Sequence, residues 1–411
     1  MSTLAPLRIP AFRRLATSYG LNELGWSFGT VALAVLAFDE TGSALATMAL
    51  FLASTFAPAL LAPALTARLD ALPVRRALPG LYLAEAALFA ALATVADHFW
   101  LPLVLLLALA DGAIAIVGRA LTRAAVATAL KPSGALAEGN KLLNVLFSLA
   151  YATGPALAGA LVAGAGVQAS LAATAALFGL MALTLGTTRA LSSAAADGDR
   201  SWWERLRGGV AHVRADGPVR RVLGAHAVAL SFAAAATPVE VIYAKQSLAA
   251  GDAGYGLVLA FWGAGTVFSS LALARARNAS ALALIPLGAG ATGIAFLTMA
   301  SAPGLSLALA GCMLGGAGNG VSYVSVVQAL QDRIPDDLQG RVMGLLESTT
   351  AGAYGVGFLM GGVMAAAVDA RAALALAGTG VLVAASAIVA LLRGDRRRAA
   401  APLAAQPEPA A

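Results

Sequence analysis

About twelve apolar stretches, each roughly 18–25 residues long, follow one another along this 411-residue chain. A helix of that length crosses the hydrocarbon core of a lipid bilayer, which is about 30 Å thick. Charged residues make up only 12% of the chain, whereas a soluble domain has about 25%, so lipid must form part of its solvent. The sequence therefore predicts an all-α, polytopic membrane protein with twelve transmembrane helices.

One long connection divides these predicted spans into two sets. The spans cover residues 15–37, 44–66, 77–96, 101–121, 141–164, 169–188, 222–244, 254–274, 280–300, 304–328, 342–366 and 371–392. The connection at 189–221 leaves six spans on each side. We therefore expect two pseudo-symmetric six-helix bundles, at 15–188 and 222–392, with a cytoplasmic N-terminus at 1–14 and a disordered cytoplasmic tail at 393–411.

The basic residues lie almost entirely in alternate connections. With the N-terminus inside the cell, the outside receives only Lys245 and Arg371. Short loops rich in Lys and Arg stay in the cytoplasm, so both termini are expected there, and the net charge of +6 does not call for nucleic acid as a partner. The excess of Arg over Lys, with abundant Ala, is typical of GC-rich coding and favours the plasma membrane of a bacterium.

The connection at 189–221 contains a predicted amphipathic helix. Ser201 and Glu204 are spaced as a capping box, the pairing that opens many helices. Beyond it, apolar residues recur at helical spacing and Arg residues take the other side. Such a helix lies at the membrane surface. It serves either as a linker between the two bundles or as a regulatory or lipid-binding element.

The two halves also resemble each other. Several residues recur at one constant interval, namely Pro132 with Pro335, Gly154 with Gly357, and Gly159 with Gly362. A parallel repeat of six spans is the arrangement of transporters whose substrate site lies at the interface between the halves, near the bilayer midplane. The pattern therefore favours a central path between two matching bundles.

Four segments carry a resemblance to a known family. They are 12–15 (Phe-Arg-Arg-Leu), 39–45 (Asp-Glu-Thr-Gly-Ser-Ala-Leu), 154–159 (Gly-Pro-Ala-Leu-Ala-Gly) and 334–342 (Ile-Pro-Asp-Asp-Leu-Gln-Gly-Arg-Val). With these segments, nearly the whole chain resembles the major facilitator superfamily, in the twelve-span branch that includes macrolide and siderophore exporters. The 154–159 segment is similar to the antiporter motif of that branch, and 334–342 is similar to its segment before span eleven.

The resemblance implies roles for both segments. The antiporter-like motif, which consists of Gly154, Pro155 and Gly159, would seal the path between the halves and favour antiport over leak. Ordinary packing of small residues between membrane helices remains the alternative. The motif before span eleven is represented by Asp336, Gly340 and Arg341.

The loop after span two departs from the family pattern. The family usually has G-x-x-x-D-R-x-G-R-R there, and its Asp helps to lock a cytoplasmic gate. The residues of this chain that would form the gate are Arg68, Asp70, Arg75 and Arg76. Ala67 stands where the family has the Asp, and Asp70 lies at a different helical phase, so the charges of this gate differ from those of the family.

Ionisable residues inside the predicted spans are candidates for proton coupling or substrate binding, because a charge in the membrane core is costly and is usually kept for function. The candidates are Glu23 with its neighbour Asn22, Glu85, Asp111 and His226. For each of them, a polar group satisfied by a neighbouring helix is the structural alternative. Glu240 and Glu347 lie toward span ends, where solvated positions are expected.

These observations favour a secondary active transporter that exports hydrophobic or amphipathic small molecules, such as drugs or antibiotics, by proton-coupled alternating access. An exporter or importer of one metabolite or siderophore is the alternative. An enzyme or a sensor is less favoured, because the sequence has no catalytic or nucleotide-binding motif and no soluble output domain. The expected partners are a small-molecule substrate, protons and lipid, with no cofactor and no metal, and the expected state is a monomer.

Overall fold

The computed structural model describes residues 5–61, 74–187, 213–275, 280–334 and 336–400, and within these ranges it contains helices and short turns but no strand. The principal helices are α1 (Pro10–Thr41), α2 (Ala44–Phe51), α4 (Val74–Val95), α5 (Leu101–Leu130), α6 (Leu136–Gly186), α8 (Gly217–Ala234), α9 (Glu240–Ile242), α10 (Gly251–Arg275), α11 (Ala281–Ser301), α12 (Leu305–Gln331), α13 (Asp336–Ala367) and α14 (Ala370–Ala400). Eleven helical segments in the described ranges are long and apolar enough to cross a membrane.

The longest segment, α6, holds two of the predicted spans. Gly166 interrupts it with φ 88° and ψ 168°, a backbone conformation that residues with a side chain rarely adopt. The predicted spans at 141–164 and 169–188 lie on either side of this glycine. The break therefore falls where the sequence predicted a connection, although the two parts form one continuous segment.

Several helices run beyond the predicted spans. α1 begins at Pro10, α5 continues to Leu130 and α14 continues to Ala400. Ala, Arg and Leu, which favour helices, fill much of these extensions. Residues 393–400 are thus helical where we expected a disordered tail, and residues 401–411 lie outside the described residues, as does most of the predicted amphipathic helix at 189–221.

Two segments are irregular where the sequence predicted continuous helix. α2 passes into a π-helical segment, η2 (Leu52–Phe56). Within the predicted span 222–244, α8 ends at Ala234, a short turn covers Thr237–Val239, and α9 then leads into a second π-helical segment, η6 (Tyr243–Ser247). Pro238 accounts for this interruption, because proline lacks the backbone donor that a continuous helix needs at that position.

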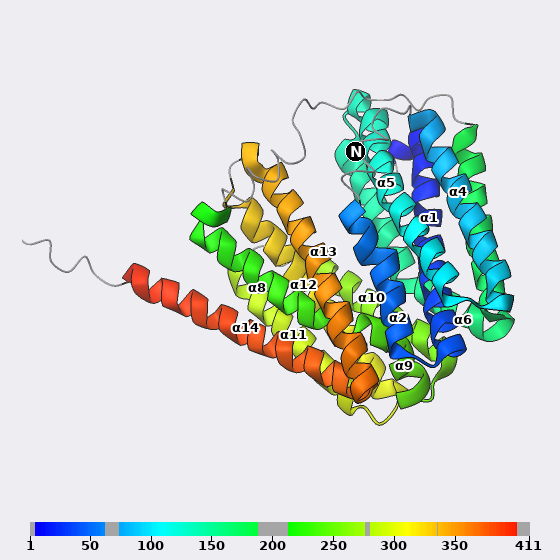
Figure 1. Ribbon diagram of the computed structural model, residues 1–411. Coiled ribbons are helices and arrows are strands. Elements are labelled where there is room, and N and C mark those ends of the chain that lie inside the picture. Colours follow the sequence, from blue (N-terminus) through cyan, green and yellow to red (C-terminus); the bar gives the residue numbers. More distant parts are fainter. Residues whose placement is uncertain (1–4, 62–73, 188–212, 276–279, 335, 401–411) are drawn as a thin grey trace, which may run out of the picture.

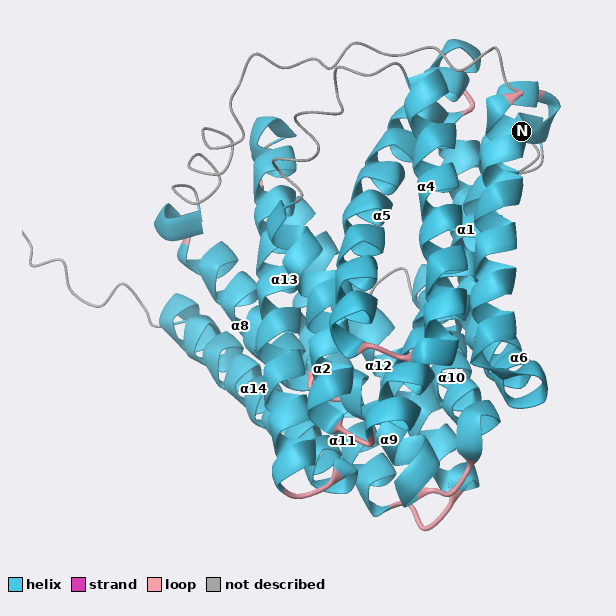
Figure 2. Ribbon diagram, turned by 45° about the vertical axis from the view of Figure 1, so that its right-hand side comes forward, coloured by secondary structure: helices cyan, strands magenta, loops and turns pink. Residues whose placement is uncertain are grey.

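The helices form two groups: in Figure 1, α1, α4, α5 and α6 lie toward the right, and α8, α11, α12 and α14 lie toward the left. α1, α2, α4, α5 and α6 pack on one another, and so do α8 and α10 to α14. The groups converge at the end that carries residues 42–43, 248–250, 302–304 and 368–369, and they diverge toward the opposite end, as Figures 1 and 2 both show. We call these the closed end and the open end.

Candidate functional site

Glycines bring the backbones of the two groups together near the closed end. A Cβ atom on Gly159 of α6 would lie 2.8 Å from the carbonyl oxygen of Asp252 and from the Cα of Gly256 on α10. A Cβ atom on Gly256 would lie 2.5 Å from the carbonyl oxygen of Pro155. Neither position has room for a side chain, so these residues set how closely α6 and α10 approach.

The antiporter-like motif therefore lies in the contact between the groups. Pro155 and Gly159 face α10, whereas Gly154 faces α1, where an added Cβ atom would lie 2.6 Å from the hydroxyl oxygen of Ser27. This geometry is that of close packing between small residues. A role of the motif in antiport stays a prediction.

A second contact joins α2 to α13. The rings of Phe51 and Phe358 lie 5.7 Å apart between centroids, and Gly362 of α13 packs against the side chain of Met48. Gly362 is the repeat partner of Gly159, which makes the equivalent contact from α6 to α10. The two interfaces thus use corresponding positions of the two sequence halves.

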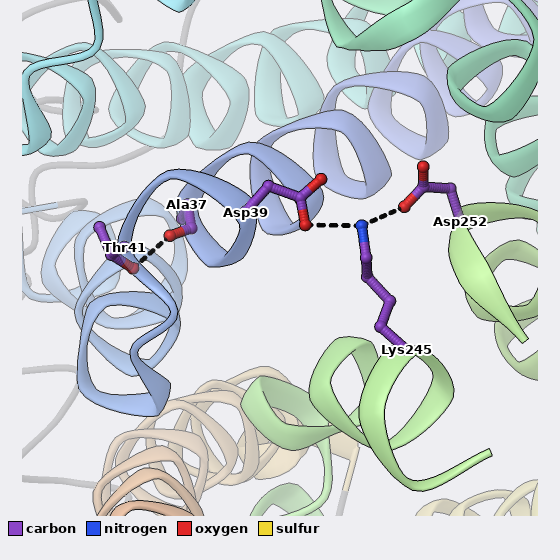
Figure 3. A network of polar contacts seen from close by, with 5 residues as sticks. All are labelled: Ala37, Asp39, Thr41, Lys245 and Asp252. Carbon is purple, nitrogen blue, oxygen red and sulfur yellow. Dashed lines mark hydrogen bonds and ion pairs between the residues drawn. The ribbon is translucent and has the colours of Figure 1, made fainter. Parts of the chain in front are cut away.

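One lysine links three segments at the closed end (Figure 3). The Nζ atom of Lys245, on η6, lies 2.6 Å from Oδ1 of Asp39 on α1 and 2.5 Å from Oδ1 of Asp252 on α10. The side chain of Lys245 is 19% exposed, and those of Asp39 and Asp252 are 41% and 23% exposed. Because Asp39 belongs to the first group and Lys245 to the second, this network crosses the interface. We call it the lysine bridge.

Arg371 is the other cation that the sequence places on the sparsely charged side. Its guanidinium donates to the carbonyl oxygens of Ala300, at 2.8 Å, and Ser247, at 3.1 Å, and it lies 5.9 Å from the centre of the Tyr243 ring. These carbonyls end α11 and η6, where a cation is favoured. Both exceptions to the charge pattern are therefore held by specific partners.

Three of the predicted candidates come together in the first group of helices. Glu23 on α1, Glu85 on α4 and Asp111 on α5 are all close enough to interact electrostatically with Arg119 on α5. Glu85 and Asp111 also interact with each other. We call Glu23, Glu85 and Asp111 the acidic cluster. The sequence proposed these residues singly, and the fold assembles them.

The members of the acidic cluster differ in their surroundings. Glu85 is buried, and its Oε2 atom has no hydrogen-bond partner among the described residues. Glu23 is half-buried and interacts with the side chains of Tyr19 and Asn22, and with the charge of a second arginine, Arg123. The cluster therefore combines one deeply buried carboxyl with one that is partly open to solvent.

His226 lies apart from the acidic cluster, on α8 of the other group. It is buried, its ring lies 6.2 Å from that of Tyr323, and its Nε2 atom has no partner within the described ranges. Tyr323 in turn interacts electrostatically with Arg123 of the first group. The two groups thus face each other here through Arg123 and Tyr323, both of which are exposed.

The two remaining motifs lie toward the open end. Arg75 and Arg76 are exposed in the first turn of α4, whereas Arg68 and Asp70 lie outside the described residues. The segment with Asp336, Gly340 and Arg341 forms the first turns of α13. The composition of a cytoplasmic gate from these residues stays a prediction.

Glu240 corrects an expectation from the sequence. We expected it to be solvated near the end of a span, but it is 8% exposed. It follows the interruption at Pro238, and the chain continues through η6 to Ser247, so the residue lies farther from the closed end than predicted. Pro238 was the available signal. Glu347 is exposed, as expected.

Among the described residues, eleven apolar helical segments in two packed groups that meet at one end define a multi-pass membrane protein. The model of the transmembrane secretion effector family, part of the major facilitator superfamily, matches residues 1–410. The chain therefore belongs to this family and is a membrane transporter of that superfamily's type. A comparison with curated proteins finds no match.

Solved structures support the same fold. The chain is similar to the nucleoside transporter NupG, with a TM-score of 0.76, 14% identity, and 93% of this chain and 99% of that one covered. It is similar to a bacterial homologue of the iron transporter ferroportin in an inward-facing state, with a TM-score of 0.73, 18% identity, and coverage of 93% and 98%. It also resembles the human organic anion transporter MFSD10 (TETRAN), with a TM-score of 0.61, 18% identity, and coverage of 92% and 99%.

Proposed function

We propose that this chain exports hydrophobic or amphipathic small molecules by proton-coupled alternating access. One observation carries the proposal. The contacts that join the two groups of helices run from the closed end, at Lys245 and Gly159, to the middle of the helices, at Gly263 and Tyr151. The acidic cluster lies near the middle of α1, α4 and α5, beside the exposed residues Arg119 and Arg123. A substrate site between two halves that close at one end is the arrangement of alternating-access transporters.

The orientation follows from the basic residues. In our proposal the break at Gly166 divides α6 into two crossings, so that the chain crosses the membrane twelve times and both termini lie in the cytoplasm. Arg75, Arg76 and the first turns of α13 are at the open end, and cationic loops favour the cytoplasmic side. The conformation is then open to the cytoplasm of a bacterial cell.

The acidic cluster is the proposed site of proton coupling. It holds three carboxyl groups against two nearby guanidinium groups, those of Arg119 and Arg123. Charges away from water require pairing, so the cluster is balanced when one carboxyl binds a proton or a cationic substrate. Competition between proton and substrate for that carboxyl would couple the two flows.

One exposed aromatic side chain lies close to Glu23 of the cluster. Trp26 follows Glu23 by one helical turn on the same side of α1, and it is 45% exposed. An indole ring beside a carboxyl suits an amphipathic molecule that carries both an apolar ring and a positive charge. Export as the direction rests on the resemblance to efflux proteins and on the antiporter-like motif.

Flux into proteoliposomes tests this proposal. With purified protein and an imposed pH gradient, a panel of fluorescent aromatic cations should accumulate faster than in empty vesicles. The variants Glu23→Gln and Asp111→Asn should reduce gradient-driven flux by about tenfold or more, because general proton-transfer groups contribute at least that factor. Glu138→Gln, in the first turn of α6, is the control and should keep normal flux.

The outcomes separate the parts of the proposal. Flux that does not depend on the pH gradient would refute proton coupling. Normal gradient-driven flux in both Glu23→Gln and Asp111→Asn would refute the acidic cluster as the coupling site. If no member of the panel moves, the proposed substrate class is wrong.

A further inference from the structure

A second buried carboxyl, outside the acidic cluster, lies where the two groups of helices meet. Glu240 begins the short helix α9, which packs against α1 of the first group and α10 of the second. Tyr151 of α6, Tyr255 of α10 and Cys312 of α12 interact with it electrostatically. Glu240 is therefore enclosed by helices of both groups, and separation of those groups would change its surroundings.

The neighbours of Glu240 are neutral or already paired. Tyr255 is 1% exposed and Cys312 is fully buried. Among the described residues, no ion pair or hydrogen bond joins the carboxyl of Glu240 to a cation. The titratable groups that interact with Glu240 are Tyr151 of α6, Tyr255 of α10 and Cys312 of α12. The elements packed around α9 also carry Asp39 on α1, Tyr243 and Lys245 on η6, and Asp252 on α10.

The nearby cations are engaged elsewhere. Lys245 follows Glu240 on the same irregular segment, nearer the closed end, and bridges Asp39 and Asp252. Arg371 binds two backbone carbonyls. A negative charge on Glu240 would thus lack a cationic partner in a site that is only 8% exposed, which is costly, whereas a carboxylic acid carries no charge.

We propose that Glu240 is a proton-binding site that is covered when the closed end is shut and is reached by water when that end opens. This inference rests on the proposed function, and it adds a proton site in the second group of helices. In this step a hydronium ion in the water at the closed end transfers a proton to the carboxylate, so that one O–H bond of hydronium breaks, one carboxyl O–H bond forms and a water molecule is left.

The protonation of Glu240 determines in which direction pH changes the population of the shut state. If the shut state holds Glu240 protonated, then lowering the pH favours the shut state, because the state that binds more protons gains as protons become abundant. Protonation of Asp39 or Asp252 would have the opposite effect, because it removes a partner of Lys245 and loosens the lysine bridge. The direction of the response therefore distinguishes Glu240 from the bridge.

Electron–electron double resonance between two spin labels measures this response without a substrate. Glu40, on α1, and Ser301, at the end of α11, are both exposed at the closed end, so Glu40→Cys and Ser301→Cys accept labels. Cys312 is fully buried and is retained, because it adjoins Glu240. Mass measurement verifies that it carries no label.

In the otherwise unchanged protein, lowering the pH from about 8 to about 5 should shift the ratio of short to long distances toward short by about tenfold. Glu240→Gln should give short distances at every pH, because the amide mimics the neutral acid. Glu240→Asp keeps a titrating group and should keep a pH response. Glu347→Gln changes an exposed carboxylate of the same group and should respond as the parent does.

Three results would overturn the inference: a parent protein that ignores pH, a response of the opposite sign, or a Glu240→Gln variant that responds like its parent. Flux in proteoliposomes is judged separately. A protein that moves none of the panel but shows the Glu240-dependent response would refute the proposed function and keep the proton site.

Discussion

The two ends of the interface between the helix groups are built differently. At the closed end, Gly159 and Gly256 bring two backbones into contact, and Lys245 bridges carboxylates from both groups. Toward the open end, Arg333 pairs with Asp216 at 3.1 Å, and both belong to the second group. The lysine bridge at the closed end thus joins the two groups, whereas the Arg333–Asp216 pair lies within one of them.

The comparison shows that an ion pair can affect the equilibrium between conformations only when its partners belong to different groups. The number of charges at each end does not decide this. An exposed pair contributes about 0–1 kcal/mol and, when both partners belong to one group, it has the same geometry however the groups are oriented. Separation of the two groups at the closed end would break the lysine bridge, because Asp39 and Lys245 belong to different groups. The lysine bridge therefore contributes to the equilibrium between conformations.

The largest effect is expected from the backbone contact. Gly256→Ala places a Cβ atom 2.5 Å from the carbonyl oxygen of Pro155, so α6 and α10 must move apart. Overpacking of this kind costs about 1–3 kcal/mol, and the population with a shut closed end should fall by roughly 5- to 150-fold. The distance between labels at positions 40 and 301 measures it.

Gly164→Ala is the matched control for that variant. Gly164 lies on α6, the helix that Gly256 of α10 contacts, and nothing lies within 4 Å of a Cβ atom added to it. It should leave the distance distribution unchanged. Equal distributions for Gly256→Ala and Gly164→Ala would mean that close backbone contact does not hold the closed end.

A smaller effect is expected from the lysine bridge. Lys245→Met leaves Asp39 and Asp252 facing each other without a cation, and loss of these partly exposed, charged hydrogen bonds should cost about 1–2 kcal/mol. The shut population should fall by roughly 5- to 30-fold. The same pair of labels reports the change, and added salt should weaken the difference between variant and parent.

Arg333→Gln removes a cation from a pair that lies within one group, so it is the comparison for Lys245→Met. The Arg333 side chain is 52% exposed, and its loss should leave the label distances as they are. A shift as large as that of Lys245→Met would show that loss of charge alone, at either end, drives the change.

Much of the helical framework could be predicted from the sequence, because length and apolar composition determine which segments cross a bilayer. Helix ends were harder. α5 continues to Leu130 and α14 to Ala400, because residues that favour helices extend past the apolar stretch. The thickness of the bilayer determines the length of the apolar stretch but not where the helix ends. The interruption at Pro238 was also missed, and with it the burial of Glu240.

The candidate site was only partly predictable. The cost of a charge in lipid singled out Glu23, Glu85 and Asp111, but their shared contact with Arg119 depends on how α1, α4 and α5 pack, which no local pattern specifies. Lys245 and Arg371 were interpreted only as exceptions to a charge pattern. Their partners come from segments far apart in the chain, so their roles required the fold.

The most direct test of alternating access compares both ends in the same protein. One pair of labels at 40 and 301 reports on the closed end, and a second pair at 131 and 332, both exposed near the open end, reports on the other. In Lys245→Met, the account predicts that the first distance lengthens while the second shortens, in matching fractions of molecules. An open-end distance that stays constant, or that lengthens with the first, would contradict it.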